Sequence, residues 1–546
     1  MGTKYAAIAI FLFSGLTVSR LPQQSKSNEP NPGSEVCSSC HAEISQSYAR
    51  TAMAGASGPA ADGLLTGEFH DNTSGVTYRV YKRDGHVWMS YERDGTNDVH
   101  GERELLYYIG SGRKGRTYLF SDDGYLFETP INWYSQEQRW NMAPAYLEAK
   151  EIPMNLPSYS SCLNCHTSDL QPRIRGTRNR FSGVPFLHDG ITCERCHGAG
   201  SEHFTNGGPI VNPASLPAEK RDAICMECHF EGTVAITQPD KKLENFKPGE
   251  NLSDYIHYFL LRDDQPQKAE ALSQFEALSF SKCKQKSGDR MWCGSCHDPH
   301  VQPKDAERAA YYRAKCVACH GDRFAAKHHP NNPDCVSCHM PTLPSKDVAH
   351  TQSTDHRILK NPTQAPLQKS VGGLQLSAFP QNAAQLVTTR DLALGWEQLA
   401  HRGVDGASHQ AQTYLDRALQ QLPDDPSLLS ALAFEQQEHG REKDAQQLYE
   451  HTLIVRPTSS TAATNLGILE AEKGDIQHAV QLWQGAFQRV PYKSEIGLDL
   501  AIVFCTAGQK DEARHYVERV LEFNPDYGKA RQLLSNLGRT PVKCSP

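Results

Sequence analysis

The sequence predicts a multidomain protein. An irregular, mainly α-helical, cysteine-rich part with an antiparallel β insert is followed by an all-α solenoid. Three observations predict this organisation. Cys-x-x-Cys-His occurs seven times before residue 340, alternating apolar and polar residues with Asp-Gly turns fill residues 69–134, and Pro, Gly and Ala recur every 34 residues after residue 392. A chain of 546 residues has room for such a set of domains.

The N-terminus has an apolar run from Tyr5 to Val18, preceded by Lys4 and followed by polar residues. About 14 apolar residues suit a secretory signal better than a membrane span, which needs about 20. We predict a signal peptide over residues 1–19, with an uncleaved anchor as the alternative, and a flexible leader over residues 20–36. The protein is expected to be periplasmic or otherwise exported, and to contact a membrane only if this segment is retained.

The seven motifs have the spacing of covalent haem attachment. Two thiols separated by two residues can reach the two vinyl groups of one porphyrin, and the adjoining imidazole can reach the iron. Composition gives roughly 0.02 such matches by chance. The predicted attachment cysteines are Cys37, Cys40, Cys162, Cys165, Cys193, Cys196, Cys225, Cys228, Cys293, Cys296, Cys316, Cys319, Cys335 and Cys338, and the predicted iron ligands are His41, His166, His197, His229, His297, His320 and His339.

Other uses of paired cysteines explain the pattern less well. Structural zinc takes four ligands per ion and does not require His after every second Cys. A redox dithiol is one motif in a βαβ setting, and disulfides leave the histidines unexplained. The net charge of −7, made more negative by haem propionates, disfavours nucleic acid as a partner.

The β insert over about 69–134 is predicted from alternation on both sides of Asp84-Gly85 and Asp123-Gly124. It contains Gly110-Ser-Gly-Arg-Lys-Gly115, which matches a dinucleotide fingerprint in letters but lies between strands without a βαβ unit, so a tight loop is predicted. Its Arg113, Lys114 and Arg116 are candidates for pairing with a haem propionate. Short helices are predicted over 43–53, 255–261 and 270–278.

After a linker over residues 358–391, the period of 34 is typical of tetratricopeptide (TPR) repeats. We predict TPR repeats over residues 392–538, with a capping helix from Lys529 to Leu537. Cys505 is expected to be a small buried residue, whereas Cys283 and Cys544 are either free or cross-linked.

The second axial ligand of each iron decides between a carrier and an enzyme. A second His fills the sixth coordination position of the iron. Met at that position raises the reduction potential, and an empty position can bind small molecules. Residues near a motif in sequence are favoured, because a neighbour in the same loop can reach the adjoining haem of a packed stack. These candidates are His188, His203, His300, His329, His350, His356 and Met53. His86 and His100 lie in the β insert and are expected to be exposed.

The phrases Gly190-Ile-Thr-Cys-Glu-Arg-Cys-His-Gly198, Cys293-Gly-Ser-Cys-His-Asp-Pro-His300 and Thr354-Asp-His-Arg357 resemble multihaem cytochromes c. The resemblance is to hydroxylamine-linked tetrahaem cytochromes and pentahaem nitrite reductases, fused here to TPR repeats. It implies a multihaem cytochrome c domain over residues 37–357, an irregular fold around stacked haems, and distal ligands at His203, His300 and His329 or His328. Such nitrite reductases carry one motif ending in Lys, and none of the seven here does, so their activity is not carried over.

We therefore expect an exported electron-transfer protein with seven c-type haems, whose TPR domain docks a redox partner protein through its concave face. The alternative is a haem oxidoreductase that acts on a small nitrogen or sulfur compound at one five-coordinate iron. A carrier is favoured over an enzyme, and purely structural haems are least expected because seven exceed structural need.

Overall fold

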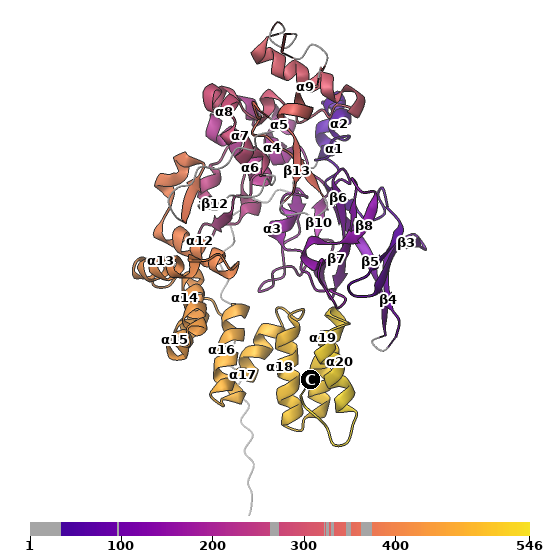
Figure 1. The fold of residues 1–546 in the computed structure, drawn as a ribbon, viewed down its shortest axis with the longest axis vertical. Helices are drawn as coiled ribbons and strands as arrows, with labels where there is room; N and C mark the ends of the chain where they lie inside the picture. Colours follow the sequence, from indigo (N-terminus) through magenta and orange to yellow (C-terminus); the bar gives the residue numbers. More distant parts are fainter. Residues whose placement is uncertain are drawn as a thin grey trace, which may run out of the picture.

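A computed structural model describes residues 34–545, except 96–97, 263–271, 322, 324–326, 329–331, 333, 346–350 and 362–373. The predicted signal peptide, most of the leader, His329 and His350 lie outside the described residues. Figure 1 shows three parts: a β-sheet, a region of short helices that carries the motifs, and a curved row of paired helices that ends beside the sheet.

The predicted β insert is an antiparallel sheet with strand order β2-β3-β4-β5-β6-β7-β8, and β1 pairs with β5. Asp84 and Gly85 (φ 51° and 86°) turn β3 into β4, and Asp123 and Gly124 (φ 49° and 76°) turn β6 into β7, which confirms both Asp-Gly hairpins. The strands are β1 (Ser57–Pro59), β2 (Gly67–Asp71), β3 (Val76–Arg83), β4 (His86–Arg93), β5 (Val99–Ile109), β6 (Gly115–Asp122), β7 (Tyr125–Tyr134) and β8 (Arg139–Met142).

The glycine-rich stretch is a tight loop between β5 and β6, as predicted. Gly110 has φ 88°, and a Cβ there would lie 2.7 Å from the Gly115 carbonyl oxygen. Arg116 is buried, donates to the carbonyls of Asp62 and Gly63, and stacks on Tyr108. Its guanidinium therefore links residues 62 and 63 to strands β5 and β6.

The motif region consists mainly of short helices joined by irregular chain. They are α1 (Ser34–Ser38), α2 (Ala42–Tyr48), α3 (Ser160–Leu163), α4 (Glu194–His197), α5 (Ser201–Asn206), α6 (Ala218–His229), α7 (Gln274–Phe280), α8 (Lys282–Ser287), α9 (Asp305–His320) and α11 (Cys335–His339). Two small strand pairs are β9 (Asp169–Leu170) with β10 (Phe186–His188), and β13 (Thr342–Pro344) with β14 (Gln352–Thr354).

The helix predicted over 255–261 is wrong. Residues Ile256–Arg262 form β12, the centre of a three-stranded sheet with β11 (Val234–Thr237) and β15 (Gln375–Phe379). Its first five residues are all buried, so the apolar run has neither the alternation of a half-exposed strand nor the stripe of a helix. The helix predicted over 43–53 is shorter and ends at Tyr48, and that predicted over 270–278 is α7.

The solenoid has the predicted register. Gly406, Gly440, Gly474 and Gly508 all have positive φ and lie between the two helices of each repeat. The helices are α12 (Thr389–His401), α13 (Ala407–Gln421), α14 (Pro426–Glu438), α15 (Glu442–Val455), α16 (Ser460–Glu472), α17 (Ile476–Phe487), α18 (Ser494–Thr506), α19 (Lys510–Phe523) and the capping helix α20 (Gly528–Leu537).

Both ends of the solenoid pack on the rest of the chain. Near its start, α12 shares a hydrophobic cluster with β11 and β12 that includes Ile236, Phe259 and Trp396. At its end, Tyr492 and Phe523 pack their rings against Phe127 of the large sheet, within a second shared cluster. The solenoid therefore has two fixed ends.

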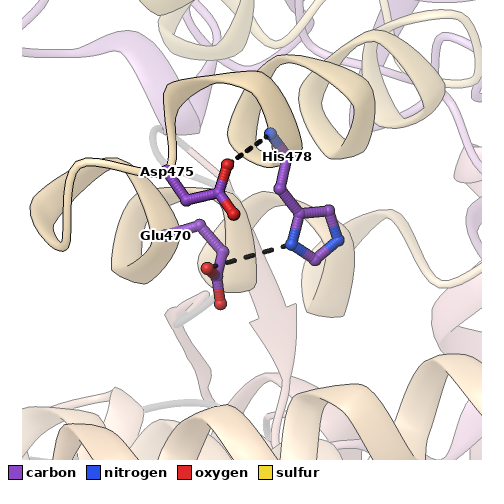
Figure 2. A group of neighbouring side chains, drawn as sticks. All are labelled: Glu470, Asp475 and His478. Carbon is purple, nitrogen blue, oxygen red and sulfur yellow. Dashed lines mark hydrogen bonds and ion pairs between the residues drawn. The ribbon is translucent and has the colours of Figure 1, made fainter.

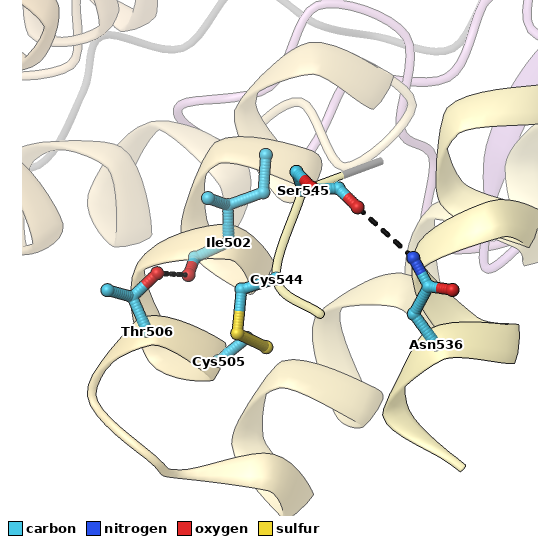
Figure 3. The surroundings of a disulfide bond; sticks show 6 residues. All are labelled: Ile502, Cys505, Thr506, Asn536, Cys544 and Ser545. Carbon is cyan, nitrogen blue, oxygen red and sulfur yellow. Dashed lines mark hydrogen bonds between the residues drawn. A yellow bond between two sulfur atoms is a disulfide. The ribbon is translucent and has the colours of Figure 1, made fainter. Parts of the chain in front are cut away.

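A disulfide joins Cys505 of α18 to Cys544 near the end of the chain, closing a separation of 39 residues over the capping helix (Figure 3). Cys505 is buried, as expected, but it is also cross-linked, whereas Cys283 is a free thiol. A disulfide agrees with an oxidising compartment.

Among the described residues, none of the helices combines the length and the hydropathy needed to span a bilayer.

Candidate haem-binding sites

Each motif folds as about one helical turn. In the first, third and fifth motifs, the histidine N–H donates to the carbonyl of the first cysteine, 2.9 Å away: His41 to Cys37, His197 to Cys193 and His297 to Cys293. In an α-helical turn, side chains at i and i+3 lie on one face with Cβ atoms about 5–6 Å apart. The local fold therefore presents both thiols of a motif on one side, next to the histidine.

Four motif histidines each face one histidine from outside the motifs. The ring centres are 5.9–6.5 Å apart in His41/His203, His197/His300, His297/His356 and His339/His328. Two imidazole nitrogens on opposite sides of one metal ion are each about 2 Å from it, and each ring centre lies about 1.1 Å further out, so the centres are about 6 Å apart. The observed spacings fit one iron between each pair.

Backbone carbonyls fix the tautomer of several of these rings. Nδ1 is 2.7–2.9 Å from the carbonyl oxygen of Val211 in His197, of Gly208 in His203, of Leu359 in His339 and of Thr354 in His356. Because a carbonyl only accepts, Nδ1 must carry the proton, which leaves the lone pair of Nε2 for a metal. The tyrosine hydroxyl of Tyr312 lies 3.2 Å from Nδ1 of His297, a contact that no sequence pattern predicted.

Burial lowers the pKa of four histidines in the motif region. Burial, followed by the neighbouring His356, lowers the pKa of His297 to about 4, and burial also lowers the pKa of His356, His166 and His229. A neutral imidazole is the form that binds a metal ion. These four histidines are therefore in the ligating state at neutral pH.

Side chains inside three motifs bind one another. Glu227, between the cysteines of the fourth motif, is buried and accepts from Arg195 of the third motif at 2.5 Å and from Asn164 of the second at 3.0 Å. Sequence reasoning passed over these residues because the pattern leaves the two intervening positions free. Their hydrogen bonds fix the relative positions of three motifs.

Thiols of different motifs lie next to one another. Those within hydrogen-bonding reach are Cys37 with Cys193, Cys165 with Cys228, Cys225 with Cys293 and Cys316 with Cys335. Cys196 also lies near Cys225, and Cys296 near Cys319. Burial and then Cys193 raise the pKa of Cys37 to about 11, so its thiol is neutral before attachment. Every motif therefore has another motif beside it.

The later motif region lacks a side-chain core. Among the described residues from 281 to 359, no apolar side chain is buried, although three motifs and the 16-residue helix α9 lie there. Near the first, third and fifth motifs, Ile44, Phe204 and Val301 are 42–62% exposed. Such apolar surfaces suit contact with porphyrin faces, so the residues present fit haem.

The remaining candidates lie elsewhere. His188 Nδ1 is 3.5 Å from Asp169, and among the described residues no motif histidine forms a ring pair with it. His257, which was not among the predicted ligands, is buried, with Nδ1 2.9 Å from Asp391 of α12. Burial raises the pKa of Asp391, but hydrogen bonds from His257 and Thr388 outweigh it and hold this pKa below its ordinary value. His257 thus attaches the solenoid to β12. His86 and His100 are exposed, as predicted.

A cavity of about 520 Å³ lies between the inner side of the solenoid and β11. It is lined by first helices of the repeats and by β11, including Ile236, Arg390, Glu397, His401 and Phe434. Burial raises the pKa of Glu397, although His401 opposes the shift.

The motifs, their paired histidines and the helical repeats define a multihaem c-type cytochrome joined to a repeat domain of the kind that binds proteins. Three family models match the chain: "Cytochrome c554 and c-prime" over residues 133–198, "Doubled CXXCH motif" over residues 286–325 and "Tetratricopeptide repeat" over residues 470–537. The chain therefore combines multihaem cytochrome c domains with TPR repeats. Several covalent haems are implied.

Solved structures resemble a quarter of the chain. A structure titled "Crystal structure of MamA" is 20% identical over 26% of this chain and 81% of its own, with a TM-score of 0.23. PilF from Pseudomonas aeruginosa is 22% identical over 27% of this chain and 68% of its own (TM-score 0.25). A tetratricopeptide repeat protein from Parabacteroides merdae is 19% identical over 27% and 59%, with a TM-score of 0.24.

Proposed function

We propose that the chain is an exported electron-transfer protein with seven c-type haems. The observation that carries this proposal is the pairing of motif histidines with second histidines at a spacing that fits one iron. A haem iron with an imidazole at both axial positions exchanges electrons without binding a substrate. Haem supplies a one-electron carrier, and the protein supplies its attachment, its axial ligands and its neighbours.

The fourteen motif cysteines attach the haems and the seven motif histidines ligate the irons. His203, His300, His356 and His328 are the distal ligands opposite His41, His197, His297 and His339. This assignment gives the iron of the first motif a histidine in place of Met53, and gives the last motif His328 in place of its sequence neighbour His329. His188, His329 and His350 stay candidates for the other irons.

The thiol contacts support a continuous arrangement of motifs. They give the order first, third, fourth, fifth, sixth and seventh, with the second motif beside the fourth. The first, second and seventh motifs are the three ends of this branched arrangement. An arrangement in which each motif adjoins another suits transfer between carriers over short distances.

The TPR repeats support docking of a redox partner protein. The inner side of the first two repeats faces β11 across the cavity described above, and it carries both charged and aromatic side chains. A partner held there would lie against β11, which begins five residues after His229 of the fourth motif.

A haem oxidoreductase is the second candidate. It is favoured by His166 and His229, for which the described residues provide no second ring at the spacing of the four pairs. An iron with an open position there could bind a small nitrogen or sulfur compound.

Carbon monoxide distinguishes the two functions. If every iron has two protein ligands, the reduced holoprotein should show no shift of its Soret band on exposure to the gas, because such an iron excludes a further ligand. A shift that corresponds to about one haem in seven would favour the oxidoreductase instead.

Intact-mass measurement of the same protein checks the number of haems. The expected mass is that of the chain plus seven haems, and fewer haems would contradict the assignment of all seven motifs.

A further inference from the structure

Three potential ligands meet at the turn between α16 and α17 in the third repeat. Glu470 lies in the last turn of α16, Asp475 caps the start of α17, and His478 lies in the first turn of α17. One ligand atom from each side chain lies within 4.8 Å of the others, and Figure 2 shows the two carboxylates and the imidazole facing a common space. This cluster includes no motif histidine and none of the residues that line the cavity between the solenoid and β11.

Glu470 is incompletely satisfied. It is only 6% exposed, its Oε1 is buried without a hydrogen-bond partner, and its Oε2 is 3.8 Å from Nδ1 of His478, which is longer than a hydrogen bond. A buried carboxylate without partners is costly, and carboxylates in such places are paired or coordinate metals. The side chain therefore lacks a ligand of opposite charge.

The preceding repeat provides an internal comparison. One period earlier, Gln436 and Arg441 occupy the positions of Glu470 and Asp475, and the same backbone bond closes both turns: Arg441 N to Gln436 O and Asp475 N to Glu470 O, each 2.9 Å. There the Arg441 guanidinium donates to the Gln436 side chain. The third repeat replaces that cation by a second carboxylate, so its buried carboxylate needs a cation from elsewhere.

We propose that Glu470, Asp475 and His478 bind a divalent transition-metal ion of the zinc class. One imidazole nitrogen and two carboxylate oxygens suit zinc, with water as the fourth ligand, whereas magnesium and calcium prefer oxygen ligands throughout. Metal–ligand bonds of about 2.1 Å place tetrahedral ligands about 3.4 Å apart, so the 3.8 Å between Glu470 and His478 needs only a small closure. The backbone N–H of His478 donates to the Asp475 carboxylate at 3.1 Å, and this hydrogen bond orients the carboxylate.

Zinc titration of the tag-free, chelator-treated holoprotein by calorimetry tests the proposal. We expect one site of unit stoichiometry, with Kd raised at least tenfold in Glu470→Gln and in His478→Gln and unchanged in His451→Gln. His451 is a matched control because it is a half-exposed repeat histidine, 2.8 Å from Asp424. The Glu470→Gln change restores the amide that the preceding repeat carries at this position, so the fold should tolerate it.

A second readout separates binding here from binding elsewhere. Zinc should raise the thermal unfolding midpoint of the helical signal in the wild type, because it binds the folded turn, but not in His478→Gln. Absence of zinc binding, or an isotherm unchanged in both ligand variants, would overturn the proposal and leave Glu470 and His478 as a simple ion pair. Neither result depends on the electron-transfer function.

Discussion

At the scale of single residues, the paired histidines make a sharp prediction. Replacing His300 with Ala removes the ring 5.9 Å from that of His197 without touching an attachment cysteine. We expect the iron held by His197 to become open, so that carbon monoxide shifts about one-seventh of the Soret band of the reduced variant. Haem content, measured by intact mass, should not change.

His100→Ala is the control for this experiment, because His100 is an exposed residue of β5 and pairs only loosely with Asp98, at 3.9 Å. It should bind carbon monoxide no more than the wild type does. If His300→Ala also behaved as the wild type does, His300 would not be a distal ligand.

The sequence predicted which histidines are candidates but could not predict the pairs. His203 follows the third motif and faces His41 of the first, while His300 follows the fifth motif and faces His197 of the third. These pairs join residues more than 100 positions apart, so they depend on the tertiary packing of the motifs. Spacing within a motif is local, and for that reason the motifs could be found from sequence alone.

At the scale of elements, periodic segments were predictable and short buried ones were not. The Asp-Gly hairpins and the repeat of 34 residues have strong local signals, because turn geometry and helix packing each require particular residue types. Strand β12 has no such signal, since its apolar run is buried on both faces and its position is decided by pairing with β15, more than 100 residues later.

The contact between β4 and the end of the solenoid depends on a buried ion pair. Arg93 donates to Asp526 at 2.6 Å, Asp526 is 3% exposed, and it also accepts from the Ile152 N–H. Asp526→Ala would remove the carboxylate that pairs with Arg93, whose side chain is 14% exposed, and with Arg531 at 3.2 Å, so we expect the free energy of unfolding to fall by about 3 kcal/mol. Urea unfolding of the holoprotein, followed by the helical signal, measures the change.

Asp123→Asn is the control at the same interface, because asparagine removes the charge but tolerates the left-handed backbone of this position (φ 49°). Asp123 pairs with Arg519 at 2.6 Å but is 42% exposed, so its loss should cost less than about 1 kcal/mol. Equal effects of the two substitutions would show that burial does not distinguish these ion pairs.

At the scale of the whole molecule, the solenoid bridges two parts of the cytochrome. Its start packs on the small sheet and its end packs on the large one, through contacts such as Tyr125 with Tyr492 and Phe523, which are more than 350 residues apart in sequence. Helical repeats are often free at one end, and nothing in their 34-residue register indicates where the ends dock. The relative placement of the parts was therefore not predictable, although the large sheet, the motifs and the repeats were, and the small three-stranded sheet was not predicted either.

This placement predicts the outcome of truncation. Removing residues 392–546 uncovers Tyr125 and Phe127, and an aromatic ring of this kind buries about 150–250 Å². We expect the truncated protein to keep its full haem mass, because attachment depends on local motifs, but to unfold at a lower urea concentration and to aggregate. Phe523→Ala in the full chain should reproduce part of the loss, about 3–5 kcal/mol. A truncated protein with an unchanged midpoint would show instead that the motif region and the large sheet are stable without the solenoid, so that the shared hydrophobic cluster contributes only to the repeat domain.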